Sequence, residues 1–157
     1  QTDFVLKKLS LTHVVSSAIN TQKTAFIQRN IYPAISIPEE MMIISDEKWL
    51  AFMIEQLLTN SLKYSYSEGK IDVTAIAHEE TIQLTMTDYG VGIPASDLPR
   101  VKRPFFTGEN GRTFGEATGM GLYLVNQVAE GLDIQLQIDS IFGQGTTVTL
   151  VFPKIKQ

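Results

Sequence analysis

The segment from Thr81 to Asp88 constrains the fold most strongly. Its residues Ile82, Leu84 and Met86 are apolar and alternate with polar ones, which is the pattern of a strand with one buried and one solvated face. Asp88 continues the apolar phase, so the pattern directs a carboxylate towards the interior. A buried carboxylate needs a hydrogen-bond donor. The chain therefore requires a sheet covered on one side, with Asp88 next to a donor.

The other periodicities predict helices and mostly hairpin-linked strands. Ser45 and Asp46 are expected to cap the central helix. The expected helices cover about 11–30, 47–64 and 120–130, and the expected strands or short apolar runs cover 35–37, 41–44, 71–77, 81–87, 134–139 and 146–152. These elements predict an α+β fold, a two-layer α/β sandwich whose mixed, mainly antiparallel sheet carries helices on one face.

Bulk properties narrow the function classes. The 157 residues fit one domain, 1–157. A net charge of −4 argues against non-specific nucleic-acid binding, and no run approaches the ~20 apolar residues of a membrane span, so direct membrane contact is not expected. There is no cysteine to form a disulfide. Because the chain starts at Gln1 rather than methionine, we expect a fragment of a larger protein.

One edge of the central helix carries a chemically mixed group of side chains. At 100° per residue, Gln56, Asn60 and Lys63 fall within an arc of roughly 60°, with Tyr64 beside it. Two amides, an ammonium group and an aromatic ring could serve a metal, phosphates and a flat base. The alternative is a solvated polar face.

Asp88 is followed by two alternate glycines, Gly90 and Gly92. Glycines at these positions permit positive φ or the close approach of a ligand. An adenine amino group would satisfy the carboxylate, whereas the O6 of guanine would repel it. The alternative is an ordinary Asp-x-Gly turn in which Asp88 caps a backbone amide.

Two further glycine-rich segments complete the pattern. Residues 94–118 show no sustained period, which indicates a functional or mobile loop, and residues 115–122 lead from it into a helix start. Glycines there would expose backbone N–H groups at the positive helix end, a possible anion site, although the sequence is neither a Walker loop nor a Rossmann motif. Gly143-Gln144-Gly145-Thr146 would by itself serve any hairpin.

In this order and spacing, the pieces resemble the catalytic domain of bacterial sensor histidine kinases, within the ATPase superfamily that includes gyrase, the Hsp90 chaperone and MutL. The resemblance covers the chain from about Phe4 to Phe152. Its motifs are similar to the N box at 60–65, the first glycine box at 88–93, the F box at 105–108, the second glycine box at 119–122 and the last one at 143–146. The sequences of the segments 45–50 and 106–112 are similar to those of kinases that sense antimicrobial peptides.

The resemblance implies a Bergerat-type ATP-binding fold and a role for each motif. Asp88 should take the adenine amino group and Tyr64 should pack near the base. Asn60, helped by Gln56, should hold Mg²⁺ with the triphosphate, and Lys63 should face phosphate. Residues 103–118 should form a mobile lid over ATP. The other expected nucleotide contacts are Gly90, Gly92, Ile93, Phe106, Thr107, Thr118, Gly119, Met120, Gly121, Leu122 and Thr146.

Two departures from the family pattern bear on mechanism. Gln56 stands where hydrolytic members carry a water-activating Glu and most histidine kinases an Asn. Lys102-Arg103 stands where the F box usually begins with Phe-Glu. Neither His13 nor His78 lies in a phosphoacceptor motif, so the dimerisation helices are expected outside this fragment.

The implied activity is transfer of the γ-phosphoryl group of ATP to a histidine on a separate dimerisation domain of the same kinase. A response regulator would act downstream. This domain would be cytoplasmic, within a parent protein of the bacterial cell membrane. Two alternatives remain: an anti-sigma serine kinase of the same fold, against which Gln56 counts, and a nucleotide-binding signalling module without transfer activity.

Overall fold

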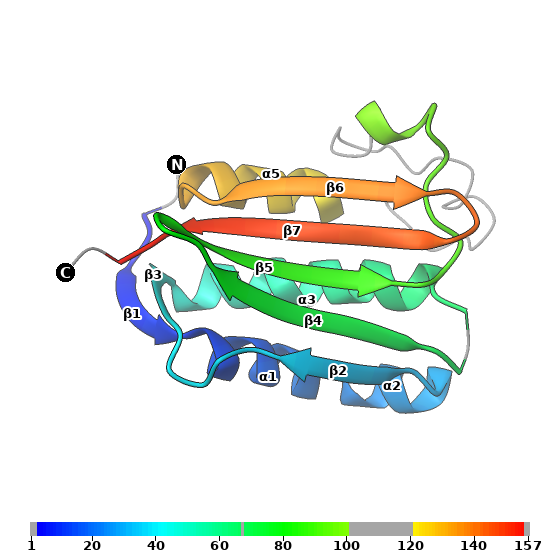
Figure 1. The fold of residues 1–157 in the computed structure, drawn as a ribbon, viewed down its shortest axis with the longest axis horizontal. Coiled ribbons are helices and arrows are strands. Elements are labelled where there is room, and N and C mark those ends of the chain that lie inside the picture. The colour runs from blue at the N-terminus through cyan, green and yellow to red at the C-terminus, as the bar shows by residue number, and fades with distance from the viewer. Residues whose placement is uncertain (1–2, 67, 101–120, 156–157) are drawn as a thin grey trace.

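The computed structural model describes residues 3–66, 68–100 and 121–155, and they form two layers (Figure 1). A five-stranded sheet has the order β2-β4-β5-β7-β6, and the helices of the described residues lie on one of its faces. Its strands are β2 (Tyr32–Ser36), β4 (Lys70–Ala77), β5 (Thr81–Asp88), β6 (Gln135–Ile141) and β7 (Gly145–Pro153). The helices are α1 (Leu11–Thr21), α2 (Lys23–Arg29), α3 (Glu47–Tyr64) and α5 (Gly121–Gly131). The expected two-layer α+β sandwich is confirmed.

The sheet is mixed because β2 pairs with β4 in parallel, while the other three pairs are antiparallel. The two parallel strands are separated in the chain by α3, which crosses behind the sheet (Figure 1). None of the described helices is both long and apolar enough to span a membrane.

The expected single helix at 11–30 is two helices. Gln22 leaves the helical conformation at φ −97° and ψ 12°, and α2 begins at the next residue. The side chain of Gln22 donates from Nε2 to Thr59 Oγ1 on α3 at 3.0 Å, a tertiary contact that helical periodicity does not report. Asn30, at φ 53°, ends α2 in the left-handed conformation.

A small second sheet covers the start of α3; its strand β3 was expected as the apolar run at 41–44, whereas β1 and its pairing were not predicted. It pairs β1 (Leu6–Ser10) with β3 (Met42–Asp46) antiparallel. Asp46 confirms the expected cap of α3: its Oδ1 accepts from the backbone N–H of Trp49 at 2.9 Å. Its Oδ2 accepts from the backbone N–H of Val5 at 2.7 Å, so one carboxylate joins the N-terminal segment to the helix.

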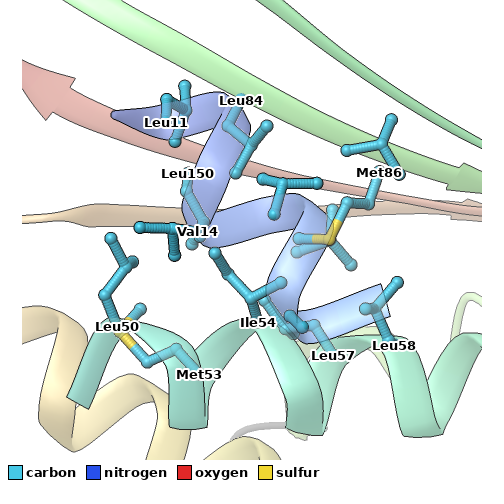
Figure 2. Packing of buried hydrophobic residues seen from close by; sticks show 14 of the residues in the cluster. Leu11, Val14, Leu50, Met53, Ile54, Leu57, Leu58, Leu84, Met86 and Leu150 are labelled. Carbon is cyan, nitrogen blue, oxygen red and sulfur yellow. The ribbon is translucent and has the colours of Figure 1, made fainter. Parts of the chain in front are cut away.

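The core lies between the helices and the inner face of the sheet, and Figure 2 shows its centre. The apolar stripe of α3 faces α1 and the inward side chains of β5 and β7. The labelled residues from these elements are Leu11, Val14, Leu50, Met53, Ile54, Leu57, Leu58, Leu84, Met86 and Leu150, all buried. Because the apolar stripe of α3 is buried in this core, the polar edge of the helix is the one that remains available to a ligand.

Candidate functional site

Three chain segments meet at one end of the sheet. They are the C-terminal end of α3, the chain that leaves β5 at Asp88, and the turn between β6 and β7 (Figure 1). Helix α5 begins at the same end, at Gly121, and η1 (Leu98–Arg100) lies there too. The fold therefore brings three of the sequence motifs together, the N box, the first glycine box and the last glycine box, although they are far apart in the chain.

Asp88 is the buried centre of this convergence, with only 4% of its surface exposed. Its Oδ1 accepts from the backbone N–H groups of Gly90 at 3.1 Å and Thr146 at 3.2 Å. The hydroxyl of Ser61 also hydrogen-bonds this carboxylate. Burial raises the pKa of Asp88, and the three donors act in the opposite direction. The inward carboxylate expected from the strand phase is confirmed.

The turn considered as an alternative for Asp88 is also present, since Gly90 donates to it. It does not stand alone, because donors from α3 and β7 reach the same carboxylate. The side chain thus joins three segments rather than closing a single local turn.

Ser61, like Ser140 described below, is a site residue that the sequence motifs did not predict. It is buried on α3, four residues after Leu57 and three after Leu58, so it lies on the apolar stripe of the helix. A hydroxyl on that stripe requires a partner, and the partner is Asp88. The available signal was this single polar interruption of an otherwise apolar face.

Gly90 is needed because two backbones touch. A Cβ there would lie 1.9 Å from the carbonyl oxygen of Tyr64 and 2.6 Å from Ser65 Cα. The same carbonyl accepts from the N–H of Val91 at 2.9 Å. Gly90 therefore allows the loop after β5 to lie directly on the end of α3.

Gly92 and Gly145 hold the loop against the β6–β7 turn. Gly92 has φ +72°, a conformation that favours glycine, and Gly143 N–H donates to the Val91 carbonyl at 2.6 Å. A Cβ on Gly145 would lie 2.1 Å from the backbone oxygen of Asp88. The last glycine motif, which alone would serve any hairpin, is thus packed against the Asp88 backbone.

Ser140 links the same segments through its hydroxyl. The N–H of Ile93 donates to Ser140 Oγ at 2.7 Å, and Ser140 Oγ donates to the Gly145 carbonyl at 2.9 Å. Ser140 Oγ also lies 2.8 Å from Thr146 Oγ1. Ile93 and Thr146, both expected at the site, are therefore fixed by one side chain.

The polar edge of α3 lies beside this buried centre. Gln56, Asn60, Lys63 and Tyr64 are all partly exposed, and Asn60 immediately precedes the Asp88 partner Ser61. Burial raises the pKa of Tyr64. Two amides, an ammonium group and a phenol ring therefore lie partly exposed on the helix whose Ser61 contacts the buried carboxylate.

The remaining expected positions divide into two groups. Gly121 starts α5, and Leu122 in its first turn is partly buried against the core. Outside the described residues lie the expected lid at 103–118, the departure from the F-box pattern at 102–103, and the expected contacts Phe106, Thr107, Thr118, Gly119 and Met120.

Both histidines are exposed, as expected of surface positions. His13 lies in α1, and His78 lies in the turn after β4 with its Nε2 2.8 Å from Gln83 Oε1. Neither lies among the three segments that meet at Asp88.

Comparison with known proteins agrees with this geometry. Residues 45–156 match the family described as histidine kinase-, DNA gyrase B-, and HSP90-like ATPase. The sensor histidine kinase YxdK of Bacillus subtilis is 40% identical over 151 residues, which are 96% of this chain and 46% of that protein. The sensor protein BceS of Halalkalibacterium halodurans is 38% identical over 154 residues, 98% of this chain and 46% of that protein. The chain thus spans about half the length of these curated relatives.

Solved structures show the same fold at low sequence identity. The catalytic domain of histidine kinase ThkA superposes with a TM-score of 0.84 at 17% identity, covering 96% of this chain and 97% of that one. The mycobacterial sensor histidine kinase MprB gives a TM-score of 0.81 at 23% identity, covering 98% and 100%. The family match, which covers more than half of the chain, shows that it belongs to the histidine kinase-, DNA gyrase B- and HSP90-like ATPases, and the curated relatives to which it is similar are sensor histidine kinases.

Proposed function

We propose that this domain binds Mg-ATP and donates its γ-phosphoryl group to a histidine on a separate dimerisation domain of the same kinase. The observation that carries the proposal is the buried carboxylate of Asp88, which lies at the junction of α3, β5 and β7 beside the polar edge of α3. A carboxylate there can accept from the exocyclic amino group of adenine, whereas guanine would present an acceptor. Tyr64, at the end of α3, is the aromatic side chain suited to pack near the base.

The donors on α3 fit a magnesium-bound triphosphate. Mg²⁺ prefers oxygen ligands, keeps several waters and relies on phosphate oxygens, so the amide oxygens of Asn60 and Gln56 are sufficient protein ligands. The bound ion would neutralise charge on the phosphates. Lys63 supplies a further positive charge on the same edge. The contribution of this domain is thus positioning and charge neutralisation.

Gln56 favours transfer over hydrolysis. Its amide cannot accept a proton from water at neutral pH as a glutamate could. A neutral histidine acceptor needs no such base, because it attacks with its own lone pair. We expect a response regulator to act downstream of that histidine, and we place the parent protein in the bacterial cell membrane with this domain on the cytoplasmic side. On the resemblance of its sequence motifs, we also place it among kinases that sense antimicrobial peptides.

The first experiment uses the parent kinase and ATP labelled in the γ-phosphate. The expected result is acid-labile label on the upstream domain, lost in Asp88→Asn. The isolated domain is expected to bind ATP, to hydrolyse it very slowly and to remain unlabelled. Rapid phosphate release, or label on His13 or His78, would contradict the mechanism. Acid-stable label on a serine of a partner protein would instead favour the anti-sigma kinase.

A second experiment separates the metal role of Asn60 from a structural role. Asn60→Ala should weaken ATP binding more than adenosine binding, because only ATP carries phosphates for the ion to bridge. Glu55→Ala, on another side of α3, is the matched control and should leave both affinities unchanged. Equal weakening of ATP and adenosine by Asn60→Ala would show that Asn60 shapes the helix instead.

A further inference from the structure

Tyr89 lies between two buried residues of the candidate site but points the other way. Asp88 and Gly90 are buried, whereas 47% of Tyr89 is exposed. Side chains alternate between the two faces of a strand, so Tyr89 extends from the end of β5 towards the face of the sheet without helices.

On that open face Tyr89 meets two charged residues of β4. Its hydroxyl donates to Asp72 Oδ2 at 2.5 Å. Lys70 Nζ lies 3.5 Å from the same oxygen and 5.6 Å from the centre of the Tyr89 ring. The hydrogen bond to Asp72, with a smaller effect of burial, raises the pKa of Tyr89, so the phenol remains a donor at neutral pH.

The contact between Tyr89 and Asp72 lies where the pairing of β4 and β5 ends and the loop at 88–92 begins. The backbone ladder between β4 and β5 ends at the pair Ile71↔Asp88. Beyond that pair, the Tyr89 side chain connects the departing chain to Asp72 and Lys70 of β4. The next residues contact other segments, since Val91 bonds to the Tyr64 carbonyl and to Gly143 N–H.

We propose that Tyr89 and Asp72, with Lys70 beside them, are positioning residues for nucleotide binding, which hold the loop at 88–92 from the face opposite the ligand. The inference rests on the proposed function of Asp88. A hydrogen bond to a charged acceptor is directional and stronger than a neutral one. Holding the loop before the ligand arrives reduces the ordering cost of binding, while an exposed contact adds little to global stability.

The test compares Tyr89→Phe and Asp72→Ala with the control Gln83→Ala. The control removes another exposed side-chain contact of β5, the one between Gln83 and His78 at the opposite end of the strand. Calorimetry measures ATP, GTP and adenosine affinity, and urea unfolding gives the midpoint of each variant. Tyr89→Phe should weaken ATP and adenosine alike, by about threefold to tenfold, because the loop serves the base rather than the phosphates.

Two further readouts distinguish positioning from general destabilisation. The preference for ATP over GTP should fall in Tyr89→Phe, and the double variant with Asp72→Ala should bind no more weakly than the weaker single variant, since both remove one contact. Gln83→Ala should keep the wild-type affinities and preference. Wild-type affinity and preference in Tyr89→Phe, or equal weakening in Gln83→Ala, would overturn the inference while leaving the proposed function intact. A wild-type protein that binds no ATP would overturn both.

Discussion

Gly90→Ala tests the claim that the glycine motif serves backbone packing within the protein. The new Cβ would lie 1.9 Å from the Tyr64 carbonyl oxygen, whereas a relaxed C···O contact is about 3.3 Å or more. The loop and the end of α3 must therefore separate by more than about 1 Å. That shift would break the hydrogen bond from Val91 N–H to the same carbonyl, which is 2.9 Å long.

The expected cost follows from these two effects. Overpacking costs about 1–3 kcal/mol, and one lost backbone hydrogen bond costs about 1 kcal/mol. We expect a free energy of unfolding lower by roughly 2–4 kcal/mol, or a Tm lower by roughly 5–15 °C for a domain of this size. The single tryptophan, Trp49, packs against Phe4 and Phe52 at the far end of α3, so its fluorescence follows global unfolding.

Gly69→Ala is the matched control. The nearest atom to a Cβ there is the Tyr66 carbonyl oxygen at 3.4 Å, an ordinary contact, so this variant should unfold at the wild-type urea concentration or slightly above it. Gly90→Ala and Gly69→Ala with the same unfolding midpoint would refute the packing argument. Ligand approach would then be the remaining reason for a glycine at position 90.

Three further predictions concern the buried groups. Asp88→Asn keeps an acceptor for the backbone donors and removes a carboxyl group whose pKa is raised by burial. The urea midpoint of this variant at pH 7 should therefore equal or exceed that of wild type, and the difference should shrink towards pH 4. A lower midpoint than wild type at pH 7 would contradict this prediction. For Asp46, burial raises the pKa, but backbone donors led by Trp49 N–H outweigh it and leave the pKa lowered, so its stabilisation is present above about pH 4 and lost on acidification. Asp46→Ala should therefore cost about 1–2 kcal/mol at pH 7 and progressively less below pH 4, as measured by urea titration at each pH. Leu57→Ala, in the centre of the core, should cost about 2–5 kcal/mol by the same assay, and a loss below about 1 kcal/mol would show that the site collapses around the cavity.

The elements that the sequence predicted best are those whose signals are local. Helix α3 spans Glu47–Tyr64, as expected, because a cap, a first-turn carboxylate and a long apolar stripe all agree. The inward direction of Asp88 followed from a two-residue period alone. For the site, these two elements already supplied the polar edge and the buried carboxylate.

The missed features depend on contacts between distant parts of the chain. Strand β1 carries Lys7 and Lys8, which interrupt an apolar pattern, and it becomes a strand by pairing with β3. The parallel pairing Tyr32↔Lys70 joins strands on either side of α3, and no local period encodes it. The role of Ser61 as a hydrogen-bond partner of Asp88 can be recognised only when α3 is placed beside β5. These features were not predicted because they depend on tertiary contacts, and not because the local secondary-structure propensity is weak.

The position of β7 between β5 and β6 has a consequence for biosynthesis. Strand β5 reaches its second neighbour only through pairs such as Thr81↔Pro153, and Asp88 receives its Thr146 donor from the same late strand. A growing polypeptide that has emerged only as far as β6 would leave an edge of β5 unpaired and this buried carboxylate under-satisfied. Competence to bind a ligand at Asp88 would then arise only once β7 has emerged and paired with β5, so that ligand binding reports a completed sheet.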